Sequence, residues 1–172
     1  MSDFVILSDS SCDLPDSLVE KYNIKLIPFY VSFDQKTYYK ERTELTIKDF
    51  YHTLRNQNVF PKTSLPSVND YMNTFTSYIK ENKGIVCFCL TSKFSGSYQA
   101  AINAKNILLE EYPDANIEVI NSVQATAGQG LIVLQAAKMQ ASGYSMKETV
   151  AKIEHLKETA RITFFVDTLE YL

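Results

Sequence analysis

The fold of this chain is decided near its start, by residues 4–27, FVILSDSSCDLPDSLVEKYNIKLI. Residues 4–8 form a short, continuous apolar run, which is typical of a strand that is buried on both faces. A polar loop follows, and Pro15 suits the first turn of a helix predicted over residues 16–22. A second strand is predicted over residues 24–27. This segment therefore predicts a β-α-β unit with a polar loop at the end of its first strand.

The same alternation continues along the chain. Further strands are predicted at 85–90, 117–120 and 162–166, with an aromatic-rich hairpin at 29–33 and 36–39. Further helices are predicted at 46–55, 67–83, 97–111, 125–141 and 145–159. Alternating strands and helices favour an α/β fold, a three-layer α/β/α domain with a mainly parallel sheet. We expect this domain to span residues 1–159 and a second α/β domain to open within residues 160–172.

Composition excludes several classes of protein. The chain has 172 residues, of which 45% are hydrophobic and 22% charged, as in ordinary globular domains. Its formal net charge of -3 argues against a basic nucleic-acid-binding surface. Its apolar stretches fall far short of the ~20 residues that span a bilayer, and we expect no secretory signal. The chain is therefore expected to be cytoplasmic, with no nucleic-acid partner and no integral membrane segment.

Neither the cysteines nor the histidines form a recognisable site. Cys87 and Cys89 stand in an apolar run, which favours burial in the core. A C-x-C pair without further ligands nearby is a poor zinc site. His52 and His155 are far apart, each among helix-forming residues. We therefore expect no metal ion and no cofactor.

Hydroxyl side chains gather in three segments, residues 8–11, 63–67 and 91–97. Serine and threonine are favoured in turns and helix caps, so any one segment has a purely structural explanation. Two of the three follow predicted strands, however, and ligands of open α/β sheets bind at the carboxyl ends of the strands. Hydroxyls beside a helix N-terminus suit an anion. Together the segments predict an anion site.

Other kinds of site match the sequence less well. There is no G-x-x-x-x-G-K-[ST] phosphate loop and no G-x-S-x-G elbow, and Gly128-Gln-Gly130 lacks the third glycine of a dinucleotide fingerprint. Two alternatives to a binding protein stay open. One is an acyl or phosphate ester hydrolase with Ser95 as nucleophile, for which only the adjacent Lys93 offers a base. The other is an interaction module without a small ligand.

Five motifs, in order along the chain, resemble the DegV family. They are Asp9-Ser-Ser-Cys-Asp-Leu14, Thr63-Ser-Leu-Pro-Ser67, Leu90-Thr-Ser-Lys-Phe-Ser-Gly-Ser-Tyr98, Gly128-Gln-Gly-Leu131 and Asp167-Thr-Leu-Glu-Tyr-Leu172. The resemblance implies a bacterial, non-catalytic protein that binds a long-chain fatty acid. It also implies that the bound carboxylate is presented to a separate ATP-dependent fatty acid kinase subunit, in the service of phospholipid metabolism. Transient contact with a membrane is left open.

The resemblance also assigns the head-group site. It places the fatty-acid carboxylate at the hydroxyls of Thr63 and Ser95. The supporting residues that it implies are Ser10, Ser64, Ser92, Gly96, Ser97 and Ser122. Each methylene of the acyl chain that is buried contributes roughly 0.8 kcal/mol, so we expect the tail to dominate affinity and the hydroxyls to set orientation.

The sequence departs from the family pattern in two places. The family usually has Asp-Ser where this chain has Asn121-Ser122. The family also continues beyond the motif at residues 167–172 into a glycine-rich turn with an arginine and a second α/β domain that helps to enclose the ligand. We therefore expect the 172-residue chain to bind fatty acid more weakly than a two-domain relative does.

Overall fold

The computed structural model describes residues 3–57, 59–163 and 165. Its main sheet contains four parallel strands in the order β2-β1-β6-β7. The strands are β1 (Phe4–Asp9), β2 (Lys25–Ile27), β6 (Gly84–Cys89) and β7 (Ile117–Asn121). β1 and β6 are buried along their whole length. The predicted α/β architecture with a parallel sheet is confirmed.

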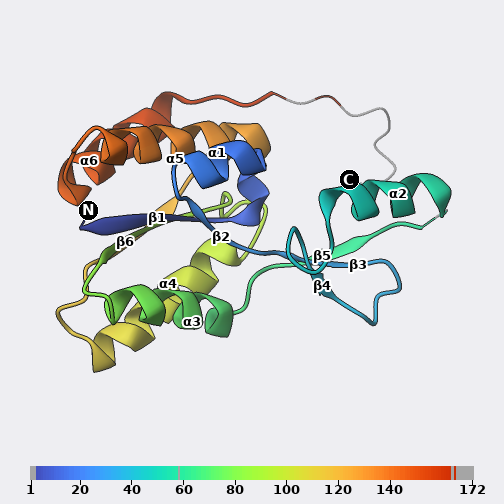
Figure 1. Cartoon of the computed structure of the whole chain (residues 1–172), viewed down its shortest axis with the longest axis horizontal. Helices are drawn as coiled ribbons and strands as arrows, with labels where there is room; N and C mark the ends of the chain where they lie inside the picture. The colour runs from blue at the N-terminus through green and yellow to red at the C-terminus, as the bar shows by residue number, and fades with distance from the viewer. Residues whose placement is uncertain (1–2, 58, 164, 166–172) are drawn as a thin grey trace.

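Alternation along the strands divides the core into two halves. On one face, Val5 and Leu7 of β1 pack with Tyr71 and Phe75, which lie on α3 (Val68–Ile79). α4 (Ser97–Glu111) covers the same face through small residues such as Ala104. α3 and α4 thus form one helical layer, on one side of the main sheet (Figure 1).

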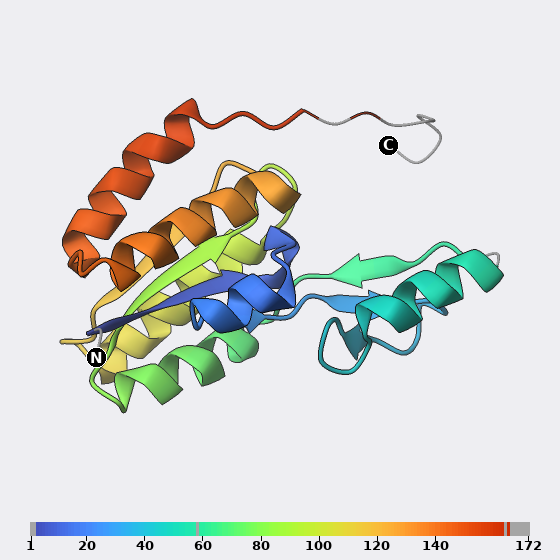
Figure 2. The ribbon, with the colours of Figure 1, turned by 45° about the horizontal axis from the view of Figure 1, so that its top comes forward.

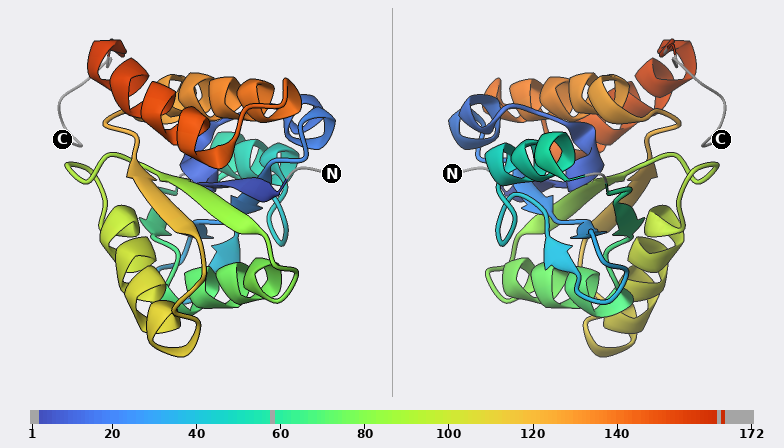
Figure 3. Two further views of the ribbon diagram at one scale, coloured as in Figure 1. Left: turned by 90° about the vertical axis from the view of Figure 1, so that its left-hand side faces the viewer. Right: turned by 90° about the vertical axis from the view of Figure 1, so that its right-hand side faces the viewer.

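The opposite face carries Phe4 and Ile6 of β1, which pack with Ile132 and Val133. This layer consists of α1 (Asp16–Lys21), α5 (Thr126–Ala141) and α6 (Met146–Thr159). The end-on views show the helices above and below the sheet (Figure 3). These boundaries agree with the predicted helices to within a few residues, as expected for ends marked by capping boxes such as Ser145 with Glu148.

A second, smaller sheet extends from the edge where β1 ends (Figures 1 and 2). It has three strands, β3 (Tyr30–Ser32), β4 (Tyr39–Lys40) and β5 (Lys62–Ser64), in the order β4-β3-β5, and α2 (Ile47–Asn56) accompanies it. β3 and β4 are antiparallel, which confirms the predicted hairpin. β5 is a correction, because Thr63, which lies outside every predicted strand and helix, pairs with Val31 in this sheet. Its run of three polar residues carries no apolar alternation that could have signalled a strand.

The strand predicted at 162–166 is not seen in the residues that can be checked. Ile162, Thr163 and Phe165 lie outside any helix or strand, and the other two positions of that range fall outside the described residues, as does the motif at 167–172. The division into a first domain and the opening of a second therefore stays a prediction.

Candidate functional site

The hydroxyl segments meet at the carboxyl edge of the main sheet. The 3-10 turn η1 (Ser10–Cys12) directly follows β1, and the segment 91–97 connects β6 to α4. Residues 63–67 connect the small sheet to α3, and the Leu65 side chain lies against Gly96, 3.4 Å from where a β-carbon at that glycine would stand. The small sheet thus brings its own hydroxyls beside those that follow β6.

Ser95 is poised to donate its hydroxyl proton. It lies next to Gly96, the N-cap of α4, and its Oγ accepts a hydrogen bond from the Ser97 amide at 3.1 Å. Among the described residues the Ser95 hydroxyl has no acceptor for its proton, which is therefore available to a ligand. A partly exposed donor at a helix N-terminus is suited to an anion.

Thr63 and Ser64 are both exposed. Thr63 borders a cavity of about 520 Å³ between the small sheet, α2 and the start of α1. Most of the other residues that line it are apolar: Leu14, Pro15, Val31, Leu45, Ile47, Phe50, Tyr51 and Pro61. An exposed hydroxyl beside an apolar cavity combines the two surfaces that an amphiphilic ligand requires.

Thr46 and three charged residues, Asp13, Glu41 and Arg42, complete the lining of this cavity. Burial raises the pKa of Asp13, against the opposing charge of Arg42. Burial likewise raises the pKa of Glu41, while a hydrogen bond from Ser10 lowers it. Arg42 itself forms an ion pair with Asp16 at the start of α1. The cavity is therefore lined by one paired cation and two carboxyls with raised pKa values.

Ser10, Ser97 and Ser122 are buried, and their hydroxyls have partners within the protein. Ser10 accepts a hydrogen bond from the Phe29 amide at 2.8 Å. Ser122 Oγ donates to the Gln124 carbonyl oxygen and accepts from the Gln124 amide. These three serines support the loops, while Thr63, Ser64, Ser92, Ser95 and Gly96 are at least partly accessible to solvent.

Asn121 joins the loops that follow β6 and β7. Its Nδ2 donates to Ser92 Oγ at 2.8 Å, and its Oδ1 accepts from the amides of Val123 and Ser92. A carboxylate at this position could only accept the hydroxyl proton of Ser92. The asparagine donates instead, and so bonds to both the amide and the hydroxyl of Ser92.

Two β-branched residues at the same edge have a strained backbone. Val123 and Thr126 have φ values of 56° and 45°, although both are β-branched. Such residues rarely adopt the left-handed region, and strain of this kind clusters at ligand sites. Val123 lies in the turn that leads from β7 to α5, and Thr126 is the first residue of α5. The strain supports assigning a function to this edge of the sheet.

A buried carboxylate at the centre of the site was missed by sequence reasoning. Asp9 is fully buried at the end of β1 and receives hydrogen bonds from Leu90, Ser97, Ser11 and Gln129. Its position directly after a buried strand, at the head of the first motif, was the available signal. Gln129 belongs to the same network, and its place in the motif Gly128-Gln-Gly-Leu131 was the available signal there. Tyr71 gave none, because it lies on the apolar face of the amphipathic helix α3.

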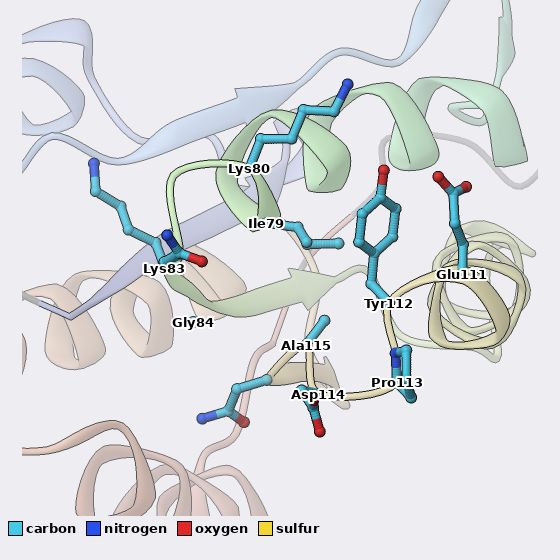
Figure 4. Close-up of a pocket in the computed structure, with 11 residues that line it drawn as sticks. Ile79, Lys80, Lys83, Gly84, Glu111, Tyr112, Pro113, Asp114 and Ala115 are labelled. Atoms are coloured by element: carbon cyan, nitrogen blue, oxygen red, sulfur yellow. The ribbon is translucent and has the colours of Figure 1, made fainter.

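Two further cavities lie away from the hydroxyl loops. One, of about 570 Å³, is at the opposite edge of the sheet, where Figure 4 shows Lys80 and Lys83 around it together with Glu111 and Tyr112. The other, of about 790 Å³, lies between α5 and α6. The first has no serine or threonine in its lining and the second has only Thr159, so neither matches the predicted anion site.

The described residues offer little for catalysis or for metal binding. Within residues 3–57, 59–163 and 165, no group of three or more His, Cys, Asp or Glu side chains is arranged to hold a metal ion. In the same part of the chain, no histidine or lysine is hydrogen-bonded to the Ser95 hydroxyl. Nor does any helix described there have the length and apolar character needed to cross a bilayer.

Comparison with known proteins identifies the family. The family described as "Uncharacterised protein, DegV family" matches residues 3–172. A DegV domain-containing protein of Clostridium perfringens is 35% identical over 173 residues, which cover 100% of this chain and 59% of that protein. Another, from Caldanaerobacter subterraneus, is 34% identical, again over 100% of this chain and 59% of the relative. The chain thus spans somewhat more than half the length of the curated relatives that it matches.

Solved structures with the same fold carry fatty acids. A stearic acid-binding protein from Eubacterium ventriosum is 43% identical, with a TM-score of 0.82, over 88% of this chain and 52% of that one. DegV from Bacillus subtilis, described as a fatty acid binding protein, is 26% identical, with a TM-score of 0.79, over 92% of this chain and 55% of its own. The fold, the ordered motifs and these relatives agree: the chain belongs to the DegV family.

Proposed function

We propose that this chain binds a long-chain fatty acid at the carboxyl edge of its main sheet. The carboxylate accepts hydrogen bonds from the hydroxyls of Thr63 and Ser95. The observation that carries this proposal is the contact between Leu65 and Gly96, which brings the two hydroxyl loops together from different sheets. Relatives described as binding stearic acid and other fatty acids support the identity of the ligand.

The accessible neighbours form a second ring around the head group. Ser64, Ser92 and the backbone at Gly96 are exposed beside the two primary hydroxyls. The buried serines stabilise the loops by hydrogen bonds. Ser10 accepts one from the Phe29 amide at the η1 turn, and Ser122 donates one to the Gln124 carbonyl in the turn before α5. Hydrogen bonds to a charged acceptor are roughly twice as strong as neutral ones, so a site made of hydroxyls and amides suffices for a carboxylate.

We further propose that the bound carboxylate is presented to a separate ATP-dependent fatty acid kinase subunit. This chain has no phosphate loop, and its Ser95 hydroxyl has no hydrogen-bonded base among the described residues. In this proposal the chain is the carrier, and the acyl phosphate is formed by its partner. The three buried, free cysteines fit the reducing cytoplasm in which such a kinase would supply phospholipid synthesis.

Phosphorylation of the bound acid tests this function directly. The chain, loaded with stearic acid, is incubated with ATP and a fatty acid kinase subunit, and acyl phosphate is measured. We expect product only when both proteins are present. Product without the kinase subunit would favour catalysis by this chain. Ester hydrolysis that is lost in Ser95→Ala would favour the hydrolase alternative.

A further inference from the structure

The buried Asp9 carboxylate joins the segments that form the head-group site. Its Oδ2 accepts from the Leu90 amide at 2.8 Å and from the Ser97 hydroxyl at 2.6 Å. Leu90 and Ser97 stand at the two ends of the loop that contains Ser92 and Ser95. A single oxygen atom of Asp9 therefore binds both ends of this loop.

The other oxygen of Asp9 connects the remaining segments. Its Oδ1 accepts from the Ser11 hydroxyl at 2.6 Å and from Gln129 Nε2 at 2.7 Å. Ser11 lies in η1 and Gln129 in α5. All four partners of Asp9 donate, so both of its carboxyl oxygens act as acceptors.

This arrangement determines where the protons of the loop point. Because the Ser97 proton goes to Asp9, the Ser97 oxygen must accept from Tyr71, whose hydroxyl lies 2.7 Å away. Burial raises the pKa of Tyr71 well above its ordinary value, which keeps its phenol protonated and able to donate. The direction of donation therefore runs from Tyr71 to Ser97 to Asp9.

The hydrogen bond between Ser97 and Asp9 also affects Ser95, whose hydroxyl is proposed to bind the ligand. With its side chain held by Asp9, Ser97 keeps its backbone amide directed at Ser95 Oγ. Ser95 then has one lone pair occupied and its proton free to face the ligand. We propose that Asp9 is the positioning residue of the head-group site, which fixes Ser95 as a donor and so selects a carboxylate over an uncharged head group.

The proposal rests on the fatty-acid function above and makes a distinct prediction about selectivity. An anionic acceptor gains more from an oriented donor than a neutral acceptor does. Loss of Asp9 should therefore weaken binding of stearic acid more than binding of 1-octadecanol, which has the same chain length. A purely structural role would lower both affinities together and leave their ratio unchanged.

The test is a competition read by native mass spectrometry. The 172-residue chain, as wild type and as variants, is incubated with an equimolar mixture of stearic acid and 1-octadecanol, and the ratio of the two complexes is measured. Asp9→Ala is expected to lower the acid-to-alcohol ratio about tenfold, as for loss of one charge-assisted hydrogen bond. Ser97→Ala removes the hydrogen bond between Asp9 and the loop, and it is also expected to lower the acid-to-alcohol ratio. If Asp9→Ala does not fold, the ratio in Ser97→Ala tests the proposal.

Conservative and control variants sharpen the result. Asp9→Asn keeps an oxygen for Leu90 and Ser97, and a flipped Gln129 amide can accept from the new NH₂ group, so this variant should restore most of the selectivity. Asp34→Asn removes another well-bonded carboxylate, in the turn between β3 and β4, and should leave the ratio unchanged. An unchanged ratio in Asp9→Ala and Ser97→Ala, or an equal fall in Asp34→Asn, overturns the proposal.

Two further outcomes separate this proposal from the function on which it rests. Tighter binding of the acid by Asp9→Ala would mean that the buried charge merely repels the ligand, which contradicts the positioning role but leaves fatty-acid binding intact. Failure of the wild-type chain to bind either compound would remove the proposed function, and the positioning role with it.

Discussion

At the scale of single residues, a hydroxyl binds an anion only if its own proton is free to point at it. Ser95 meets this condition, since its oxygen accepts from the amide of Ser97 and its proton has no acceptor among the described residues. Ser97 itself does not, since its proton is engaged by Asp9. The sequence placed both in one motif, and proximity in sequence could not distinguish the binding hydroxyl from the supporting one. That difference arises from burial and from partners distant in the chain.

Removal of either primary hydroxyl is predicted to weaken fatty-acid binding while leaving the fold intact. Thr63→Ala and Ser95→Ala each delete one hydrogen bond to a charged group, which contributes roughly 1.5–3 kcal/mol, equivalent to a ten- to hundredfold loss of affinity. Titration with a fluorescent fatty acid measures the effect. Ser77→Ala, which removes an exposed hydroxyl on α3 that bonds to the Thr74 carbonyl, is the matched control. Wild-type affinity in both Thr63→Ala and Ser95→Ala would contradict the assignment.

Strain at Val123 gives a prediction about stability. This residue has a φ of 56° and is nearly half exposed, so its side chain contributes little packing to offset the strain. Asparagine tolerates the left-handed region, and Val123→Asn should therefore raise the free energy of unfolding, by about 1 kcal/mol. Chemical denaturation compares the variant with Val19→Asn, a change on α1 away from positive φ that should destabilise. A loss of stability in Val123→Asn would show that the turn is not strained.

Asp34 should show a measurable pH dependence. Hydrogen bonds from the amides of Thr37 and Lys36 lower the pKa of its carboxyl to about 2. Because the folded-state pKa lies below the unfolded value, the contribution of Asp34 to stability is present above pH ~4 and is lost as the pH falls through about 2. The Asp34 carboxyl resonance, followed by NMR, reports the midpoint. A midpoint near 4 would mean that the turn is open in solution.

At the scale of elements, the sequence predicted those helix ends that depend on hydrogen bonds between residues close together in the chain. Capping at Ser67 and Ser145 predicted the starts of α3 and α6, because the bonds that define a capping box lie within four residues. The edge strand β5 was missed, because its pairing with β3 depends on a partner some thirty residues earlier and not on its own polar sequence. The motif therefore predicted that Thr63 binds the carboxylate, but it did not predict that Thr63 lies on a strand.

Close packing between α5 and the η1 turn is predicted to be intolerant of added volume. A β-carbon at Gly130 would overlap the Cys12 carbonyl oxygen and crowd the Leu14 side chain. Gly130→Ala should thus destabilise the fold by about 1–3 kcal/mol, as overpacking does, even though alanine favours helices. Thermal unfolding provides the measurement. Gln135→Ala, an exposed substitution on the same helix, is the control, and equal stability of the two variants would mean that η1 can move aside.

At the scale of the whole molecule, hydroxyl-bearing loops that are far apart in the sequence lie together at the carboxyl edge of the parallel sheet. The main sheet supplies Asp9, Ser92 and Ser95, and the small sheet adds Thr63 through the approach of Leu65 to Gly96. Strand order and layer structure followed from apolar runs and alternation, so the fold class could be predicted. The network around Asp9 could not, because it depends on side chains from positions as distant as 9 and 129.

The central claim, that this chain holds a long-chain fatty acid at Thr63 and Ser95, is tested most directly by native mass spectrometry. The 172-residue chain is purified without added lipid and its mass is compared under native and denaturing conditions. The account predicts a mass increment of a single C16–C18 fatty acid on the wild-type chain, strongly reduced in a Thr63→Ala, Ser95→Ala double variant that unfolds at the same temperature. A wild-type chain that carries no fatty acid, even after incubation with stearic acid, would contradict it.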